Sequence, residues 1–327
     1  YILYKNKIKY PWSDDLTSRR LINLLYNYEF INSSSKENET KLLNKIILLH
    51  IHRIIFETKY KSVNKITSYD LIANNLSYFI LNKKNNKIKK FTFFVINKQI
   101  DKLGMHKSYN VLEHARYLNN LDELKNIFLY FENESPKYIE EILIKMKSVL
   151  NSYFHIDGSI PLFNGANNNY TNIIANSLNK DEYLKTRNFS NSLNGLAFFS
   201  GKNKRLFFDV IQPNNKDVSN NLSAGTLSFE YSCFGEKLIT NCGASESLGK
   251  NPEYLRYSAA HSTVVLQNTN ISEIRQDKTN IKFPQSVTFE SDQDKNKSIF
   301  IGSHNGYQNK FKKIIKRKLE IHDNENK

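Results

Sequence analysis

The stretch Leu222–Gln267 decides the fold that we expect. Within it, Thr226-Leu-Ser-Phe-Glu-Tyr-Ser232 alternates large apolar side chains with polar ones. This period of two is typical of a half-buried antiparallel strand. A turn at Phe234-Gly-Glu236 and a second strand over Lys237–Thr240 complete a hairpin. A third strand is expected over Thr263–Leu266.

The same period of two begins near Leu193 and continues to the end of the chain. Further strands are expected over Leu206–Val210, Val287–Phe289, Ile299–Ile301 and Ile314–Ile321. Short strands at such intervals, with turns between them, indicate an antiparallel sandwich. Residues up to about 155 instead show the spacing of amphipathic helices and no strand pattern, and Phe91–Ile100 is interpreted as helix from this context. The chain is therefore predicted to be α+β, with helices first and sheet second.

Length and composition are those of a globular chain. Its 327 residues suggest about two domains, and 39% of them are hydrophobic. No apolar run reaches the roughly 18 residues of a membrane span, so none is expected. The chain begins at Tyr1 rather than Met and ends in the charged stretch Lys312–Lys327. We expect it to be a fragment of a longer protein.

The net charge of +15 favours anionic partners. An alternative is that a genome rich in A and T produced it, because Lys, Asn, Ile, Tyr and Phe all have AT-rich codons and all are abundant. No helix-turn-helix, aromatic sheet signature or zinc knuckle is present, so nucleic acid is not the expected partner. The two cysteines, Cys233 and Cys242, either form a disulfide across the hairpin or stay free. The sequence leaves the oligomeric state open.

Four motifs carry a resemblance to a family. They are Asn241-Cys-Gly243, Arg256-Tyr-Ser-Ala-Ala-His-Ser-Thr263, Gly104-Met-His106 and Asp157-Gly-Ser-Ile-Pro-Leu-Phe-Asn-Gly165. In this order they resemble motifs of the heparinase II/III-like polysaccharide lyases. The resemblance implies an incomplete (α/α) toroid over residues 1–175, followed by an antiparallel β-sandwich over residues 176–327. It also implies that the protein lies in the cell envelope or periplasm.

The family resemblance implies a polysaccharide lyase that cleaves a uronate-containing, acidic glycan by β-elimination. A base takes the C5 proton, a polar or cationic group neutralises the adjacent carboxylate, and an acid protonates the leaving oxygen. Histidine and tyrosine suit the proton transfers, whereas Asn, Arg or protonated His suits the carboxylate. No cofactor is expected.

In the helical part, His106 is the first candidate catalytic residue, as the base or as a carboxylate ligand; the alternative is a capping or surface histidine. Tyr153 is the candidate acid/base tyrosine, and Tyr109 and Tyr170 compete with it. Any of the 19 tyrosines could instead belong to the core or the surface. Asn164, in the Phe-Asn-Gly motif, is a candidate substrate-binding residue.

In the sheet part, His261 is the third candidate catalytic residue, and Arg256 and Asn221 are candidate substrate contacts. Arg256 is equally consistent with a surface arginine. In several relatives the histidine at position 261 joins another histidine and an aspartate around zinc, at the positions that Ser223 and Asn241 occupy here. One strong ligand does not make a zinc site, so no metal is predicted.

A second hypothesis comes from the same positions. Asn221 stands where the family has a catalytic histidine, and asparagine cannot act as a general base near neutral pH. The alternative function is therefore a non-catalytic glycan-binding protein, or a protein of cell-envelope polysaccharide assembly, on the same scaffold.

Overall fold

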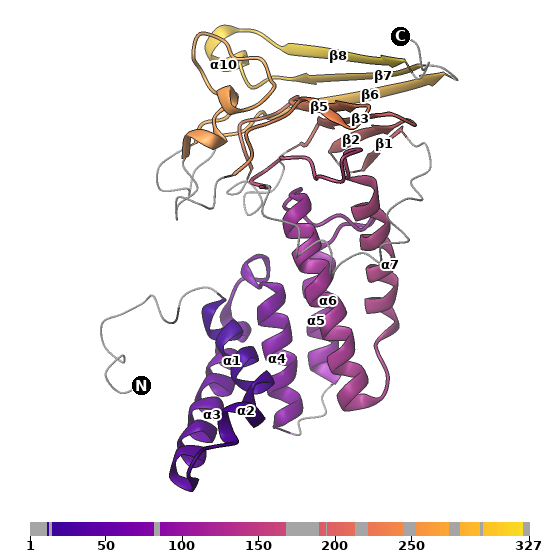
Figure 1. Ribbon diagram of the computed structural model, residues 1–327. Coiled ribbons are helices and arrows are strands. Elements are labelled where there is room, and N and C mark those ends of the chain that lie inside the picture. Colours follow the sequence, from indigo (N-terminus) through magenta and orange to yellow (C-terminus); the bar gives the residue numbers. More distant parts are fainter. Residues whose placement is uncertain are drawn as a thin grey trace. The chain divides into compact units, whose positions relative to one another are not determined.

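The structure is a computed structural model that describes residues 12, 15–81, 86–167, 190–193, 195–212, 222–244, 253–274, 282–294 and 297–322 (Figure 1). The chain divides into two compact units. The first unit consists of Tyr1–Gln99 and Asn120–Leu143, and the second unit of Ile100–Asn119 and Ile144–Lys327. The boundary that the sequence analysis places between a helical domain (residues 1–175) and a sheet domain (residues 176–327) stays a prediction.

The first unit is helical, as the apolar spacing predicted. Its helices are α1 (Leu16–Tyr26), α2 (Tyr28–Asn32), α3 (Glu37–Tyr60), α4 (Ser68–Ile80) and α5 (Asn86–Gln99), with a short 3-10 turn over Val63–Lys65. The helices α6 (Val111–Glu132) and α7 (Lys137–Ser152) each run through both units. In the described part of the chain, no helix is both long enough and apolar enough to cross a membrane.

Helix α4 shows how polar residues fix the helical unit. Thr67 Oγ1 accepts a hydrogen bond from Asp70 N at 3.2 Å, and Asp70 Oδ2 accepts one from Thr67 N at 3.0 Å. This reciprocal capping box satisfies two backbone donors that the first turn leaves open. The same carboxylate also accepts from Ser18 Oγ and from Lys61 Nζ, each at 2.6 Å. One buried aspartate therefore links α4 to α1 and to the residue that follows α3.

The second unit contains two antiparallel sheets, and Figure 1 shows the three-stranded sheet lying over the five-stranded one. The five-stranded sheet has the order β1-β2-β3-β4-β5, with strands Ser190–Leu193, Leu196–Ser200, Lys204–Asp209, Phe229–Cys233 and Glu236–Ile239. The other sheet consists of β6 (Val287–Asp294), β7 (Lys297–His304) and β8 (Ile315–His322). Short helical turns occur over Glu253–Arg256, Ser258–Ala260 and, as α10, Gln308–Phe311.

One apolar cluster joins the two sheets. It contains Phe208 of β3 and Phe300 of β7, together with Leu227, which precedes β4. A Cβ atom on Gly302 of β7 would lie 2.4 Å from Leu227 Cδ2, so only glycine allows this close approach. The sheets therefore pack face to face as a β-sandwich, which confirms the predicted α+β fold class.

The expected strand over Thr263–Leu266 is wrong. Of these residues only Leu266 makes a β-bridge, an isolated one with Thr269. Thr263 N instead bonds to His261 O at 2.8 Å, and Thr263 Oγ1 donates to Thr226 O at 2.7 Å. Because the threonine hydroxyl satisfies a neighbouring carbonyl, the segment holds its place without a ladder of backbone bonds.

Strand β4 is also more buried than the half-buried strand that the sequence predicted. Ser228, Glu230 and Ser232 are exposed by 0%, 0% and 1% respectively, although they form the polar side of the alternation. Phe229 and Tyr231, on the apolar side, pack against the cluster between the sheets. Both sides of the strand are therefore covered, and the polar side needs partners inside the protein.

The sandwich core yields a first prediction. Phe208→Ala should lower the free energy of unfolding by about 3–5 kcal/mol, because it removes a fully buried aromatic side chain and leaves a cavity. Urea denaturation followed by circular dichroism measures the change. The control Leu238→Ala removes a side chain on β5 that is 63% exposed, and should change stability by less than about 0.5 kcal/mol. Equal effects of the two substitutions would contradict the assigned core.

Candidate functional site

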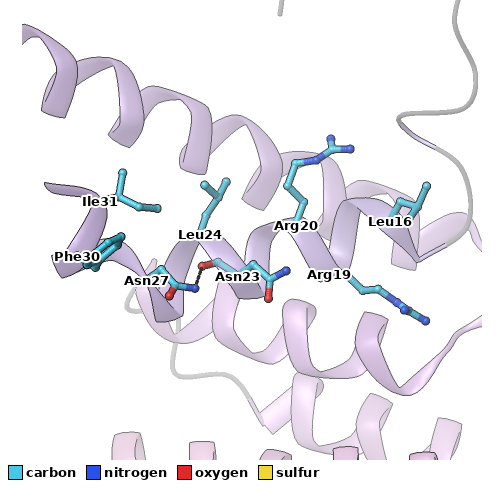
Figure 2. A pocket seen from close by; sticks show the side chains of 8 residues that line it. All are labelled: Leu16, Arg19, Arg20, Asn23, Leu24, Asn27, Phe30 and Ile31. Carbon is cyan, nitrogen blue, oxygen red and sulfur yellow. Dashed lines mark hydrogen bonds between the residues drawn. The ribbon is translucent and has the colours of Figure 1, made fainter. Parts of the chain in front are cut away.

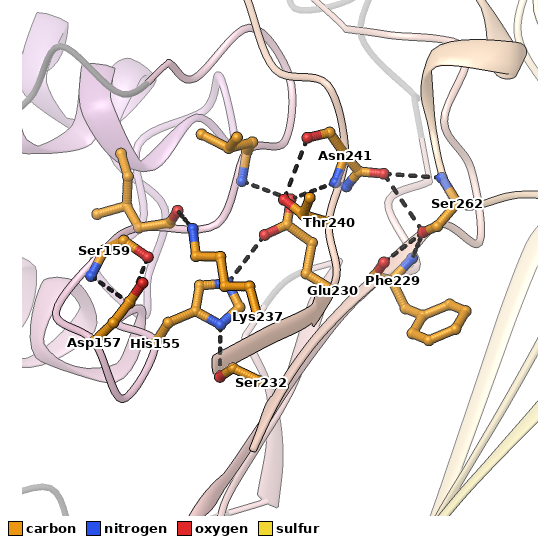
Figure 3. Close-up of polar contacts among 12 residues, drawn as sticks. His155, Asp157, Ser159, Phe229, Glu230, Ser232, Lys237, Thr240, Asn241 and Ser262 are labelled. Atoms are coloured by element: carbon orange, nitrogen blue, oxygen red, sulfur yellow. Dashed lines mark hydrogen bonds and ion pairs between the residues drawn. The ribbon is translucent and has the colours of Figure 1, made fainter. Parts of the chain in front are cut away.

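The buried carboxylate of Glu230 joins three separate segments of the second unit (Figure 3). Its Oε1 accepts hydrogen bonds from Leu162 N at 2.9 Å and from Asn241 N at 3.0 Å. Its Oε2 lies 3.0 Å from Nε2 of His155. Charge-assisted bonds of this kind are stronger than neutral ones. Strand β4 is thereby tied to the loop that follows α7 and to the corner that follows β5.

His155 forms the other half of this contact. Its Nδ1 lies 2.8 Å from Ser232 Oγ, so both ring nitrogens bond to side chains on the polar side of β4 (Figure 3). The ring also contacts Phe207 edge-on, with 4.8 Å between ring centroids. Nearby, Asp157 Oδ1 accepts from Ser159 N at 2.9 Å, which shapes the Asp-Gly turn. The Asp-Gly…Phe-Asn-Gly motif is therefore held on the sheet through His155, which precedes it, and through Leu162 within it.

The corner at Asn241 holds the segment that carries His261. Asn241 Oδ1 accepts a hydrogen bond from Ser262 N at 3.0 Å, and Ser262 Oγ accepts one from Phe229 N at 2.8 Å (Figure 3). The ring of His261 rests on Gly225, where a Cβ atom would lie 3.1 Å from its Cγ and Cδ2. The asparagine and histidine motifs are thus parts of one local structure.

His261 is uncharged at neutral pH. Burial lowers the pKa of His261 to about 4, and the charge of Glu230 offsets part of this effect. Its Nε2 is buried and bonds to no group in the described part of the chain. The histidine therefore packs as a neutral ring beside the corner at Asn241.

His106 lies in the loop before α6. His106 N donates to His114 Nδ1 at 3.2 Å, and His114 Nε2 lies 2.9 Å from Met146 O. Ser108 N donates to His106 Nδ1 at 3.3 Å, so the ring proton of neutral His106 lies on Nε2. Burial lowers the pKa of His106 to about 3, with smaller contributions from His114 and Lys107. His106 is therefore a neutral imidazole that offers an N–H.

A chain of hydrogen bonds leads from His106 to the sheet segment. Ser108 Oγ accepts from Asn110 N at 3.2 Å, and Asn110 Nδ2 donates to Asn164 O at 3.1 Å. Asn164 Oδ1 in turn accepts from Ser223 N at 3.4 Å. The network brings His106 and Asn164 together with the start of the stretch that leads to Gly225 and His261. It lies entirely within the second unit.

The side chains of Asn164 and Arg256 bond to the backbone. Asn164 is 4% exposed and has φ of +53°, and its Nδ2 donates to Tyr109 O at 3.3 Å. Arg256 is 8% exposed, and its guanidinium donates to Leu222 O at 2.8 Å. These bonds position the loops around the network. Direct contact of either residue with a substrate stays a prediction.

Tyr153 is buried away from solvent. Its side chain is 0% exposed, its hydroxyl donates to Leu196 O at 2.9 Å, and burial raises its pKa. A glycan could reach this hydroxyl only if the packing against β2 opened. Tyr109 is partly exposed and has φ of +50°; burial, with smaller contributions from Asp101 and Asp209, raises the pKa of its phenol. Tyr109 is thus the better placed of these two tyrosines.

Asn221 and Tyr170 lie outside the described residues. The structure does describe Ser223 and Asn241, the two positions at which relatives have zinc ligands. Their side chains do not fit a zinc site. Ser223 contributes a hydroxyl and Asn241 an amide whose oxygen already bonds to Ser262. Within the ranges that the structure covers, no three His, Cys, Asp or Glu side chains lie close enough to share a metal ion. The expected lack of bound zinc remains a prediction for elemental analysis.

A separate groove in the first unit contains none of the predicted site residues (Figure 2). It runs along α1 and α2, has a volume of about 660 Å³, and is lined by Leu16, Arg19, Arg20, Asn23, Leu24, Asn27, Phe30 and Ile31. Arg19 is already paired with Asp15 at 2.7 Å and lies 4.1 Å from the ring centre of Tyr69. We therefore place the candidate site in the second unit.

Sequence reasoning missed Ser108 and Asn110, which link His106 to Asn164, and it also missed Glu230 and His155. The only signal for these last two was indirect: the Glu lies on the polar side of the alternating stretch Thr226–Ser232, and the His comes two residues before the Asp-Gly turn. Neither signal says that the two side chains meet, because 75 residues separate them.

Glu230→Gln should lower the free energy of unfolding by about 3–5 kcal/mol, as is usual when one partner of a buried pair is removed. An amide cannot accept bonds at both ends, so one of the donors Leu162 N, Asn241 N or His155 Nε2 loses its acceptor. Denaturant titration measures the loss. The matched control is Glu290→Gln, an exposed residue on β6, which should leave stability unchanged. A similar small effect of both variants would exclude the bridging role.

His261 should make stability depend on pH. Its pKa of about 4 in the folded protein lies below the ordinary value of 6.5. The unfolded chain therefore binds more protons between these values, and stability is lost as the pH falls from 6.5 towards 4. Urea midpoints of the wild type should drop over this range, and His261→Asn should drop less. An identical drop in both proteins would show that His261 does not contribute.

Comparison with known proteins gives a consistent result. Residues 185–327 match the family model described as heparinase II/III-like, C-terminal, whereas no curated protein matches the chain. A crystal structure of heparinase III aligns with a TM-score of 0.70 at 15% identity, over 98% of this chain and 55% of that one. The heparan sulfate lyase HepC from Pedobacter heparinus aligns with a TM-score of 0.62 at 16% identity, over 96% and 53%.

The chain thus spans about half the length of these solved structures. At such low identity the likeness shows the fold, and it extends over nearly the whole chain. The family match covers the β-sandwich and includes the hairpin corner and the segment of His261. Residues 185–327 thus match the heparinase II/III-like C-terminal domain, and the chain as a whole has the fold of the solved heparinase III structures.

Proposed function

We propose that the full-length protein is a polysaccharide lyase that cleaves an acidic, uronate-containing glycan by β-elimination. The observation that supports this most is the network that connects His106 to the sheet stretch beside His261. Both histidines are neutral at physiological pH, and their segments are fixed by hydrogen bonds. A site of this kind can present uncharged donors and acceptors to a sugar without reorganising.

In this proposal His106 binds the uronate carboxylate. Its Nδ1 already accepts a bond from Ser108, so its Nε2–H is the available donor. A pKa of about 3 makes His106 a poor base, since a general base works best with a pKa near the operating pH. A hydrogen bond from Nε2–H to the carboxylate would stabilise the negative charge that grows there as a base of the full-length protein, which is neither His106 nor Tyr109, takes the C5 proton.

Tyr109 is the proposed acid for the leaving oxygen. Its raised pKa keeps the phenol protonated at neutral pH, so it can donate a proton. It follows Ser108 in the network, and its own carbonyl accepts a bond from Asn164, which fixes the backbone at this point. The burial of Tyr153 supports the choice of Tyr109 over it.

A second candidate is a non-catalytic protein that binds an acidic glycan. It is favoured by Asn164 and Arg256, whose side chains bond to the backbone and so do not serve the elimination. A location in the cell envelope is part of either proposal, and rests on the family resemblance alone.

The test uses the full-length protein and a panel of acidic polysaccharides, with the absorbance of the unsaturated uronate product as the readout. His106→Ala should lower kcat/KM by about 10²–10⁴-fold, because a group that stabilises the transition state is lost. Tyr109→Phe should cause a loss of similar size. The matched control is His52→Ala, an exposed histidine on α3, which should keep full activity.

Two outcomes would change the proposal. Full activity of His106→Ala, with an unchanged thermal midpoint, would show that the active site lies elsewhere. Binding of an acidic glycan by the wild type without any elimination product would favour the non-catalytic candidate.

A further inference from the structure

A second polar pocket lies in the second unit, and no residue of the candidate site lines it. It has a volume of about 530 Å³ and is lined by residues 270, 271, 273, 282–285, 305, 306 and 308–310. This size is typical of sites for small molecules, about 300–1,000 Å³. Five of the lining side chains are amides: Asn270, Gln285, Asn305, Gln308 and Asn309. Amides both donate and accept hydrogen bonds, as sugar hydroxyls do.

Two of these amides are oriented by the backbone. Asn270 Oδ1 accepts a hydrogen bond from Ser258 N at 2.9 Å, and Asn305 Oδ1 accepts one from Ser286 N at 3.0 Å. Because each oxygen is engaged, the assignment of oxygen and nitrogen in the amide follows from the contacts. Neither NH₂ group bonds to another group in the part of the chain that the structure describes. The pocket therefore contains two oriented donors that are free for a ligand.

The pocket has an apolar base beneath the amides. Ile271 is 3% exposed and Pro284 is also buried, while the ring of Phe283 is half-buried. A Cβ atom on Gly306 would lie 2.7 Å from Ile271 Cγ2, so the absence of a side chain lets the turn after β7 lie against this base. Apolar surface with a few placed polar groups is the usual composition of a small-molecule site, and it suits the C–H face of a sugar ring.

The charge of the pocket is positive. Lys282 and Lys310 line it, and Glu273 is its one carboxylate. Lys310 Nζ donates to Thr269 Oγ1 at 2.9 Å and forms no ion pair among the described residues. Lys282 Nζ lies 3.5 Å from Glu273 Oε2, in an exposed and weak pair. At least one ammonium group is therefore available for an anionic ligand.

We propose that this pocket binds one acidic sugar residue, with amide groups on its hydroxyls and Lys282 and Lys310 on its carboxylate or sulfate. The two anionic groups share the same chemistry here, so the test includes both. The inference does not require that the protein be a lyase, since it concerns binding at residues outside the candidate active site.

The test is a titration of the ¹⁵N-labelled protein, followed by the NMR shifts of the backbone amides of Ile271 and Gly306. The probes are glucuronate, glucose 6-sulfate and neutral glucose. We expect saturable shifts with at least one acid, and an affinity for it at least about threefold higher than for glucose. The better acid identifies the anionic group. No shift with either acid, or equally tight binding of glucose, would overturn the proposal.

Variants connect the shifts to the pocket. The double variant Lys282→Gln with Lys310→Gln should weaken binding of the acid at least about threefold, without affecting glucose. Asn305→Asp keeps the oxygen that accepts from Ser286 N but replaces the NH₂ donor, and should weaken binding further. The matched control Lys316→Gln changes an exposed lysine on β8 that does not line the pocket. Equal affinity in the control and the double variant would assign the binding to overall charge and overturn the site.

The result is separate from catalysis. The same titration with His106→Ala should give unchanged pocket shifts, because His106 lies outside this pocket. A protein that shows the shifts but no elimination product would retain the sugar pocket and lose only the proposed activity. A protein that cleaves a glycan but shows no shifts would lose only the pocket.

Discussion

The structure of the second unit depends on one buried negative charge. A carboxylate without solvent is unstable in a protein interior unless hydrogen bonds and a partner compensate for the lost water. Glu230 meets this condition with two backbone amides and an imidazole. His155 and Leu162 lie in the loop after α7 and Asn241 lies in the corner after β5, so satisfying the charge also holds these two segments on β4. The corner at Asn241 then positions Ser262 and, through the backbone, His261.

The helices and most strands were predictable from the sequence because each depends on a local period. The pattern near Leu193 separated helix from sheet, and the strand β4 was located within a few residues of its observed bounds. The residues that pack against a strand can lie far from it in the sequence, so a local pattern does not reveal them. The polar side of β4 looked like a solvent face, because its main partner, His155, lies far away in the chain. Over Thr263–Leu266 the sequence predicted a strand, but the hydroxyl of Thr263 made the contact that a neighbouring strand would have made.

The candidate site was predictable to a similar extent. The motifs identified His106 and His261, and the structure shows that the segments of both are held by specific hydrogen bonds. Motifs fix positions in the chain but not the direction of a side chain. Tyr153 follows a helix at the right place in the order of motifs, yet its hydroxyl turns to the carbonyl of Leu196 inside the protein. Arg256 was predicted to be either a substrate contact or a surface arginine, and its guanidinium holds the backbone carbonyl of Leu222.

The contact between Gly225 and the ring of His261 has a consequence for how this sequence can vary. With 3.1 Å between a would-be Cβ and the ring, a methyl group would need a shift of a few tenths of an ångström, and a longer side chain would displace the ring. The two positions therefore cannot change independently. Among homologues, a larger residue at position 225 should occur together with a smaller residue, or a relocated backbone, at position 261. The pair would then appear as covariation between two motifs that lie more than thirty residues apart in the chain.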